Sequence, residues 1–187
     1  MAAWAAGSMT TSELRGGPTQ PEVCAVALSK LAVRPGDIAV DIGCGTATVS
    51  VAIARTADLV YAIDMRPEAI TVAGRTIADS GLTNITLLEG DALSFLEEME
   101  EIDVAFIGGS KGLLQVLSLL AEKRVRTIVV NAVLLETATL AIGTMRELSI
   151  FSEAVHLQVS RSHDLAGKTM FKPENPIYII VGGCGQC

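Results

Sequence analysis

Short apolar runs rich in β-branched residues alternate with helix-length segments along most of the chain. The apolar runs lie at 38–42, 59–64, 85–89, 102–107 and 127–132, and continuous runs of this length are typical of buried strands. Helices are predicted over 21–31, 49–57, 67–80, 112–123 and 137–148. Because strands and helices that alternate are joined by right-handed crossovers, this pattern predicts an α/β fold with a parallel sheet.

The C-terminal part of the chain departs from this alternation. Segments 153–160 and 176–182 both have the pattern of strands, and the polar segment 161–175 between them is predicted to be a loop. Two strands joined without a helix close such a sheet as an antiparallel hairpin. We expect a single domain over 16–183, preceded by a disordered segment over 1–15 and followed by a short tail over 184–187.

The composition limits the classes of function. Hydrophobic residues make up 50% of the 187 residues and aromatic residues only 4%, so Val, Ile, Leu and Ala must fill the core. The formal net charge of −7 lacks the basic footprint of a nucleic-acid-binding domain. No uncharged apolar run reaches the roughly 18 residues of a membrane span, and the N-terminal residues lack the basic start of a signal peptide. We therefore expect a cytoplasmic protein without nucleic-acid or membrane partners.

The four cysteines do not indicate a metal or redox site. Cys24 lies in an apolar helical pattern, where a buried thiol is the usual outcome. Cys184 and Cys187 form a C-x-x-C pair at the end of the sequence, but a zinc site needs two further ligands and the redox motif normally opens a helix. We predict no bound metal.

A glycine loop with the sequence D-I-G-C-G-T-A, at 41–47, lies directly between a predicted strand and a predicted helix. Gly43 and Gly45 let the backbone turn tightly and approach a ligand with no Cβ in the way. Asp64 ends the second strand, 23 residues after Asp41, where a carboxylate accepts hydrogen bonds from ribose hydroxyls. Asp91 follows the third strand, where an adenine edge can be read. The pattern predicts a nucleoside cofactor, and the alternative is a structural turn with two surface aspartates.

Two residues favour S-adenosyl-L-methionine over a dinucleotide as this cofactor. Dinucleotide-binding loops follow G-x-G-x-x-G, and Thr48 stands where the third glycine would be. Asp41 would repel a pyrophosphate, whereas its negative charge suits the cationic amino-acid part of S-adenosylmethionine.

Three motifs together, D-I-G-C-G-T-A, Y-A-I-D and E-G-D-A, resemble class I S-adenosylmethionine-dependent methyltransferases. That resemblance implies a Rossmann-like sheet of seven strands that ends in an antiparallel hairpin. Four further segments resemble the decarboxylating cobalt-precorrin-6B C(15)-methyltransferases of cobalamin biosynthesis, namely 17–19, 106–110, 133–137 and 167–170. The resemblance runs from about Gly16 to about Gly182. It implies transfer of a methyl group to carbon 15 of a precorrin, with decarboxylation of the ring C acetate.

The resemblance also assigns cofactor-binding residues and an assembly. The implied cofactor contacts are Thr19, Gly43, Cys44, Gly45, Thr46, Ala47, Asp64, Asp91 and Ala92. Ala47 departs from the family, which usually has glycine there, and its methyl group is expected to crowd the methionine part of the cofactor. Cys44 is expected to line the loop and not to act as a nucleophile, because no histidine lies near it in the sequence. The implied oligomer is a homotetramer.

A tetrapyrrole substrate with many carboxylates requires cations that this acidic chain must gather locally. The candidate substrate-binding residues are Lys111, Glu136, Arg161, His163 and Lys168, with Lys172 beside them. The alternatives are a solvated loop for the cations near the C-terminus and a helix-capping role for Glu136. The sequence identifies no catalytic acid or base.

Two other functions remain open from the sequence. One is a class I methyltransferase for another substrate, such as tRNA adenosine or an isoaspartyl protein. The negative charge and the absence of an N-P-P-Y tetrapeptide after the fourth strand argue against the RNA substrate. The other is a non-catalytic cofactor-binding module.

Overall fold

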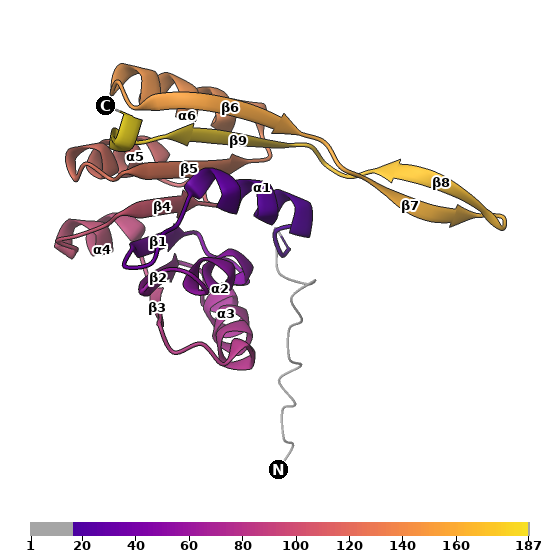
Figure 1. Ribbon diagram of the computed structural model, residues 1–187, viewed down its shortest axis with the longest axis horizontal. Coiled ribbons are helices and arrows are strands. Elements are labelled where there is room, and N and C mark those ends of the chain that lie inside the picture. The colour runs from indigo at the N-terminus through magenta and orange to yellow at the C-terminus, as the bar shows by residue number, and fades with distance from the viewer. Residues whose placement is uncertain (1–16, 187) are drawn as a thin grey trace, which may run out of the picture.

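A seven-stranded sheet with helices on both faces forms the body of the protein, and the computed structural model describes residues 17–186 (Figure 1). In sheet order the strands are β3 (Ile85–Glu89), β2 (Leu59–Asp64), β1 (Ile38–Ile42), β4 (Val104–Ile107), β5 (Thr127–Ala132), β9 (Ile177–Gly182) and β6 (Phe151–Leu157). The first five are parallel to one another, and β9 is antiparallel to both β5 and β6. The predicted α/β class and the antiparallel closure of the sheet are confirmed.

The helices pack in one layer on each face of the sheet. They are α1 (Pro21–Leu31), α2 (Thr48–Ala54), α3 (Pro67–Ser80), α4 (Ala92–Glu98), α5 (Leu113–Glu122) and α6 (Leu135–Glu147). Helices α1 to α3 lie on one side and α4 to α6 on the other. Our prediction lacked α4, a helix of seven residues.

The central strands are buried on both faces, which explains their continuous apolar runs. On β1, Val40 and Ile42 pack into the core beneath α4 to α6, whereas Ala39 packs on the α1 and α2 side. Asp41 is fully buried in the same strand. A carboxylate in such a strand is costly to bury, so its presence indicates a function beyond packing.

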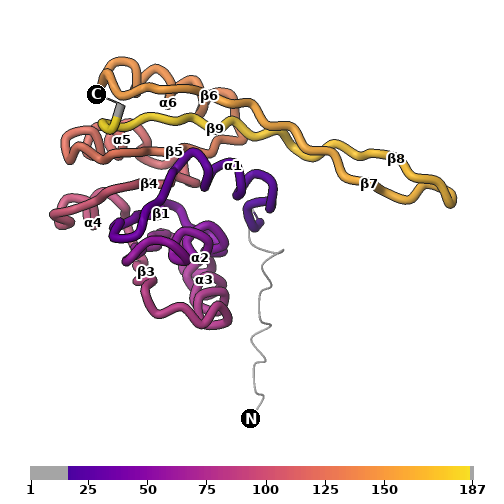
Figure 2. Tube along the Cα trace, viewed as in Figure 1, coloured from indigo at the N-terminus to yellow at the C-terminus, as the bar shows by residue number. Residues whose placement is uncertain are grey.

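A two-stranded antiparallel arm projects from the sheet between β6 and β9, and consists of β7 (Ser160–Leu165) and β8 (Lys168–Pro173) (Figures 1 and 2). The prediction of a loop over 161–175 is therefore wrong. Ala166 and Gly167 both have positive φ, as the two-residue turn of a hairpin requires. Every residue of the two strands is exposed, so neither face carries the apolar alternation from which a strand is recognised.

The segment after β9 docks onto the turn that precedes β5. The backbone N–H groups of Cys184 and Gly185 donate to the carbonyls of Val125 and Arg126 at 2.9 and 3.1 Å. The domain boundaries at 16 and 183 stay a prediction, and the expected disordered segment 1–15 and Cys187 lie outside the described residues. Within residues 17–186, no helix combines the length and the hydropathy that crossing a bilayer demands.

Candidate active site

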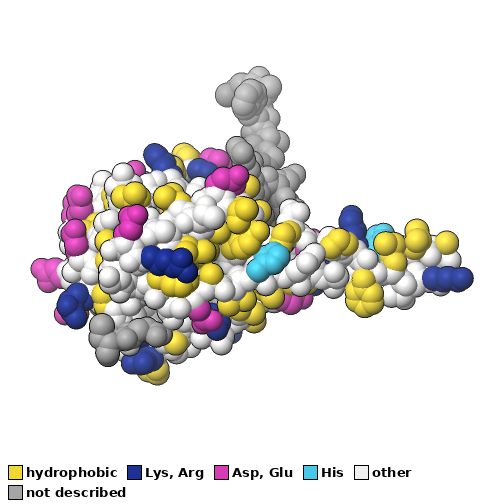
Figure 3. Space-filling model, turned by 90° about the horizontal axis from the view of Figure 1, so that it is seen from above, with side chains coloured by type: hydrophobic (Ala, Val, Ile, Leu, Met, Phe, Trp, Pro, Cys, Tyr) yellow, Lys and Arg dark blue, Asp and Glu magenta, His cyan; other side chains and the backbone are white. Residues whose placement is uncertain are grey.

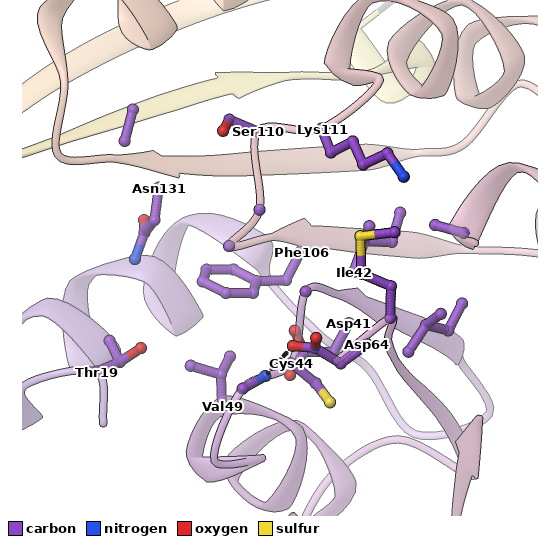
Figure 4. Close-up of a pocket in the computed structure, with 18 of the residues that line it drawn as sticks. Thr19, Asp41, Ile42, Cys44, Val49, Asp64, Phe106, Ser110, Lys111 and Asn131 are labelled. Atoms are coloured by element: carbon purple, nitrogen blue, oxygen red, sulfur yellow. Dashed lines mark hydrogen bonds between the residues drawn. The ribbon is translucent and has the colours of Figure 1, made fainter. Parts of the chain in front are cut away.

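A cavity of about 890 Å³ opens at the carboxyl ends of the parallel strands (Figure 4). Its wall comes from the loops after β1, β2, β3, β4 and β5 and from residues 17–20 before α1. The strand order reverses between β1 and β4, and open α/β sheets bind ligands at such a switch point.

The glycine loop is held between the ends of β2 and β4. Gly43 and Gly45 have φ of 72° and 56°, in the left-handed region that favours glycine. A Cβ on Gly43 would lie 2.7 Å from the backbone nitrogen of Gly109. At Gly45 the nearest atom to a Cβ is Arg66 Nη2, at 3.8 Å. Gly43 is therefore needed where two loops pack together, whereas Gly45 faces the more open side.

Ala47 also has a positive φ, of 58°, and begins α2. Its methyl group is fully buried beside Cys44, Ala62 and Ala73, and it is not part of the cavity wall. The methyl group therefore packs into the core and not into the cavity wall, and the cofactor contact expected of Ala47 stays a prediction.

Asp41 presents a buried carboxylate to the cavity. Its Oδ2 accepts a hydrogen bond from Ser50 Oγ at 2.5 Å, and its Oδ1 has no partner among the described residues. Burial raises the Asp41 pKa to about 7, and the nearby charge of Asp64 adds to this rise against the Ser50 hydrogen bond. Asp41 is thus poised to change its charge near neutral pH.

Asp64 is almost fully buried at the end of β2 and accepts four hydrogen bonds. Two come from the backbone N–H groups of Gly45 and Arg66, and two from the guanidinium of Arg66. Burial alone would raise the Asp64 pKa, but the hydrogen bonds from Arg66 and Gly45 outweigh it and lower the pKa. The carboxylate is therefore ionised.

Asp91 and Lys111 lie close together in the cavity wall. Asp91 Oδ1 caps α4 by accepting from the backbone N–H of Leu93 at 2.9 Å. Lys111 Nζ lies 3.9 Å from Asp91 Oδ2. Thr19 and Ala92 lie in the same wall. The structure therefore gathers Thr19, Gly43 to Thr46, Asp64, Asp91 and Ala92 around one cavity, and their cofactor contacts stay predictions.

Cys44 is buried in the glycine loop. Burial, with the charges of Asp41 and Asp64, raises the pKa of its thiol well above the ordinary range. A thiol in this environment stays protonated and is a poor nucleophile.

Comparison with known proteins defines the family. The sequence profile of the precorrin methyltransferase domain matches residues 13–182. The chain belongs to this family. A Methanosarcina mazei protein named "Probable cobalt-precorrin-6B C(15)-methyltransferase (decarboxylating)" is 48% identical over 172 residues, which are 89% of this chain and 94% of that protein.

Two solved structures agree with this assignment of the precorrin methyltransferase domain. A protein described as precorrin 8W decarboxylase, from Methanobacterium thermoautotrophicum, has a TM-score of 0.87 and 35% identity and covers 94% of this chain and 96% of its own. A precorrin-6y C5,15-methyltransferase from Geobacter metallireducens has a TM-score of 0.85 and 28% identity, with 98% of both chains covered.

The structure does not gather all predicted substrate-binding residues of this precorrin methyltransferase domain at the cavity. Lys111 lies in the wall, whereas Glu136 is exposed in the first turn of α6, outside it. Arg161, His163 and Lys168 lie on the arm, also outside the wall. Arg161 instead pairs with Glu22 of α1, at 2.6 Å. Within one chain, the expected cationic pocket is not formed by the C-terminal segment.

Asn131, on β5, was not among the predicted site residues. Its side chain lies in the cavity wall beyond Phe106, as seen from the glycine loop (Figure 4). Its Oδ1 is buried without a hydrogen-bond partner among residues 17–186. The available signal was an amide in an otherwise apolar strand, Thr127–Ala132. An unsatisfied buried acceptor costs about 1–3 kcal/mol, so a ligand that donates to it would be favoured.

No group of three or more His, Cys, Asp or Glu side chains within residues 17–186 is arranged to hold a metal ion. Cys24 is a free, buried thiol, and Cys184 is free as well. Cys184 Sγ lies 3.8 Å from the carbonyl oxygen of Ala121, in the packing of the segment after β9.

Proposed function

We propose that this domain transfers a methyl group from S-adenosyl-L-methionine to carbon 15 of cobalt-precorrin-6B, or a related precorrin, and decarboxylates the ring C acetate, whose carboxylate leaves as carbon dioxide. The reaction belongs to cobalamin biosynthesis, and we propose the cytoplasm as its compartment. The observation that carries the proposal is that the glycine loop, Asp64 and Asp91 line one cavity, in a member of the precorrin methyltransferase family. The name of the 48% identical relative supports the choice of substrate.

The donor set of the cavity fits this cofactor, which supplies a methyl group bonded to a sulfonium sulfur. The unpartnered Asp41 Oδ1 is a buried acceptor suited to an ammonium group. Asp64 is an ionised carboxylate suited to ribose hydroxyls. Asp91 and Ala92 are proposed to border the adenine, Gly43 to Thr46 to border the methionine part, and Thr19 to close the site from before α1.

The cavity extends past Phe106 toward the end of β5, and we propose that this part holds the tetrapyrrole. Its wall combines the polar side chains of Ser110, Asn131 and Thr137 with Val133 and Leu134. Val133 and Leu134 are 58% and 62% exposed. Exposed apolar side chains at a cavity rim suit the apolar face of a macrocycle. Lys111 is the proposed partner for a substrate carboxylate.

The main task of the protein in this reaction is to position the methyl donor and the macrocycle relative to each other. The new bond to carbon 15 uses an electron pair of the macrocycle, and loss of carbon dioxide leaves an electron pair on the former acetate carbon, which then takes a proton. Holding a methyl donor and a carbon nucleophile in line contributes several kcal/mol to catalysis. We assign no residue as the proton donor.

We also propose a homotetramer in which the arm of β7 and β8 contacts another copy. A two-stranded hairpin is marginally stable alone in water. Leu165 and Phe171 on this arm are 60% and 69% exposed, and Figure 3 shows hydrophobic side chains on the surface of the arm. The arm carries Arg161, Lys168 and Lys172 against Asp164, whereas the whole chain has a charge of −7. A second copy therefore offers complementary charge, and the arm would supply cations to a neighbouring cavity.

The decisive experiment is mass spectrometry of the products from cobalt-precorrin-6B and S-adenosylmethionine. The proposal expects one product that has gained a methyl group and lost carbon dioxide. Methylation of tRNA or of an isoaspartyl peptide, with the precorrin unchanged, would support the alternative methyltransferases. Cofactor binding without transfer to any of these acceptors would support a non-catalytic module.

A further inference from the structure

The carboxylate proposed to bind the cofactor ribose is already saturated. An ionised carboxylate has about four lone-pair sites for hydrogen bonds. Asp64 Oδ1 accepts from Arg66 N at 3.0 Å and from Arg66 Nε at 2.9 Å. Asp64 Oδ2 accepts from Gly45 N at 3.0 Å and from Arg66 Nη2 at 2.8 Å. No acceptor site on Asp64 is left for two ribose hydroxyls.

The four hydrogen bonds to Asp64 differ in how readily they can be exchanged. The bonds from Gly45 N and Arg66 N belong to the backbone of two loops that fix the carboxylate. The bonds from Nε and Nη2 come from the Arg66 side chain, which is 35% exposed. Arg66 is also a residue of the cavity wall. The same guanidinium lies over the glycine loop, since its Nη2 is the nearest atom to a Cβ on Gly45. It therefore occupies the side of Asp64 that faces the cavity.

We propose that the Arg66 side chain is a competitor for the ribose subsite, and that the cofactor binds by exchanging its two guanidinium N–H donors for two ribose hydroxyls. The exchange keeps four hydrogen bonds on Asp64 and keeps both backbone bonds. Arg66 thus lowers the affinity for the methyl donor and for its product equally, which favours product release. The inference rests on the proposed function, because it requires a cofactor with a ribose at this site.

The test is calorimetric titration of S-adenosylhomocysteine into the full-length protein and its Arg66 variants. Arg66→Ala should bind about fivefold more tightly than the parent, because a partly exposed ion pair no longer has to be broken. Arg66→Lys should also tighten binding, since lysine keeps the charge but not the planar two-donor fork. Arg55→Ala, which removes an exposed arginine at the end of α2, should leave the affinity unchanged.

The opposite result has a clear meaning. If Arg66 only orients Asp64 for the ribose, Arg66→Ala and Arg66→Lys will both weaken binding, and the proposal is overturned. An affinity gain for Arg66→Ala with none for Arg66→Lys would indicate a charge effect alone and would also overturn the exchange. If the parent itself does not bind S-adenosylhomocysteine, the proposed function fails together with this inference. In the ¹⁵N NMR spectrum of the parent, the Arg66 Nε–H signal should shift when the ligand binds.

Discussion

Ser50 donates a hydrogen bond to Oδ2 of Asp41, a residue of the cavity wall, whereas Asp41 Oδ1 is buried without a partner among the described residues. One helix residue therefore fixes the orientation of a strand carboxylate whose second oxygen stays available to a ligand. The pKa of about 7 places the ionisation of Asp41 in the physiological range. A cation at Oδ1 would favour the ionised form.

The first prediction is that cofactor affinity rises with pH through neutrality. Only ionised Asp41 attracts an ammonium group, so S-adenosylhomocysteine should bind roughly tenfold more weakly at pH 6 than at pH 8, from a pKa of about 7. Calorimetry in buffers of different ionisation enthalpy should record proton release at pH 6.5. Ser50→Ala should move the transition to higher pH, because the Ser50 hydrogen bond lowers the Asp41 pKa.

Asp41→Asn is the control for that experiment. It keeps the acceptor for Ser50, and its affinity should be independent of pH over this range. A raised pKa means that the folded state holds the proton more tightly, so the stability from Asp41 is present below about pH 4 and is lost as pH rises through about 7. Asp41→Asn should therefore be more stable than the parent at pH 8. A parent whose affinity stays constant between pH 6 and 8 would exclude Asp41 as the ammonium partner.

The second prediction concerns Gly43, where a side chain strains the fold before it affects any ligand. Gly43→Ala should lower the free energy of unfolding by about 2 kcal/mol or more, because it adds a left-handed alanine and a 2.7 Å contact with Gly109 N. Gly74→Ala, in the interior of α3, is the matched control and should raise stability by about 0.5–1 kcal/mol. Urea unfolding measures both. Equal stabilities for the two variants would show that the loops can move apart.

The strands of the sheet were predictable where their residues are mostly apolar and buried. β1, β2, β3 and β5 match their predicted bounds. β1, β2 and β5 are mostly buried, as in strands that are covered on both faces and appear as apolar runs, whereas β3 lies at the edge of the sheet and is only partly buried. The arm could not be predicted in this way. His163 and Met170 face each other across the two strands, yet both are exposed, so no hydrophobic alternation marks the pairing.

The candidate site was predictable only for residues whose position along the chain, at the end of a strand, also fixes their position in the fold. Gly45 and Asp91 follow a strand and Asp64 ends one, and the carboxyl ends of parallel strands meet at one edge. Arg161 was expected at the cavity because of its charge, but its side chain pairs with Glu22 instead. A long-range ion pair of this kind depends on how an arm crosses a helix, which local sequence does not encode.

The third prediction concerns Asn131 and separates substrate binding from cofactor binding. Asn131→Ala should weaken precorrin binding about tenfold, the loss of one hydrogen bond to a buried amide, and should leave S-adenosylhomocysteine affinity unchanged. The effect should appear in KM more than in kcat if the amide holds the substrate in its ground state. An equal loss of affinity for the precorrin and for S-adenosylhomocysteine would mean that Asn131 stabilises the structure of the whole cavity and does not bind the substrate specifically.

The fourth prediction concerns the pair of Asp37 and Arg126, which ties the segment before β1 to the turn before β5. Arg126 donates two hydrogen bonds to the buried Asp37 carboxylate, at 2.6 and 3.0 Å. Burial would raise the Asp37 pKa, but Arg126 and the Arg34 N–H outweigh it and lower the pKa. Asp37→Asn should lower the free energy of unfolding by about 2–3 kcal/mol at pH 7.

The pH dependence of that cost follows from the lowered pKa. A depressed carboxyl pKa gives stability that is present above the unfolded value of about 3.9 and is lost as pH falls through the folded value. The difference in the free energy of unfolding between the parent and Asp37→Asn should therefore become smaller below pH 4. Asp58→Asn, at an exposed carboxylate that accepts a hydrogen bond from Gly36 N, should lower the free energy of unfolding by less than about 1 kcal/mol. If the two variants lose similar amounts of unfolding free energy at pH 7, the ion pair with Arg126 contributes little to stability.

The fifth prediction tests the arm as a contact between copies. Replacing Leu165 and Phe171 together by serine should dissociate the proposed homotetramer, because both apolar side chains are exposed within one chain and need a partner to be buried. Light scattering after size-exclusion chromatography should then record a smaller species, while the thermal unfolding of the separate domain keeps its cooperativity. Leu114→Ser, which changes an apolar side chain of α5 that is 47% exposed, should leave the assembly intact. If the double variant elutes with the mass of its parent, the arm does not hold the copies together, and its cations cannot be assigned to a neighbouring cavity.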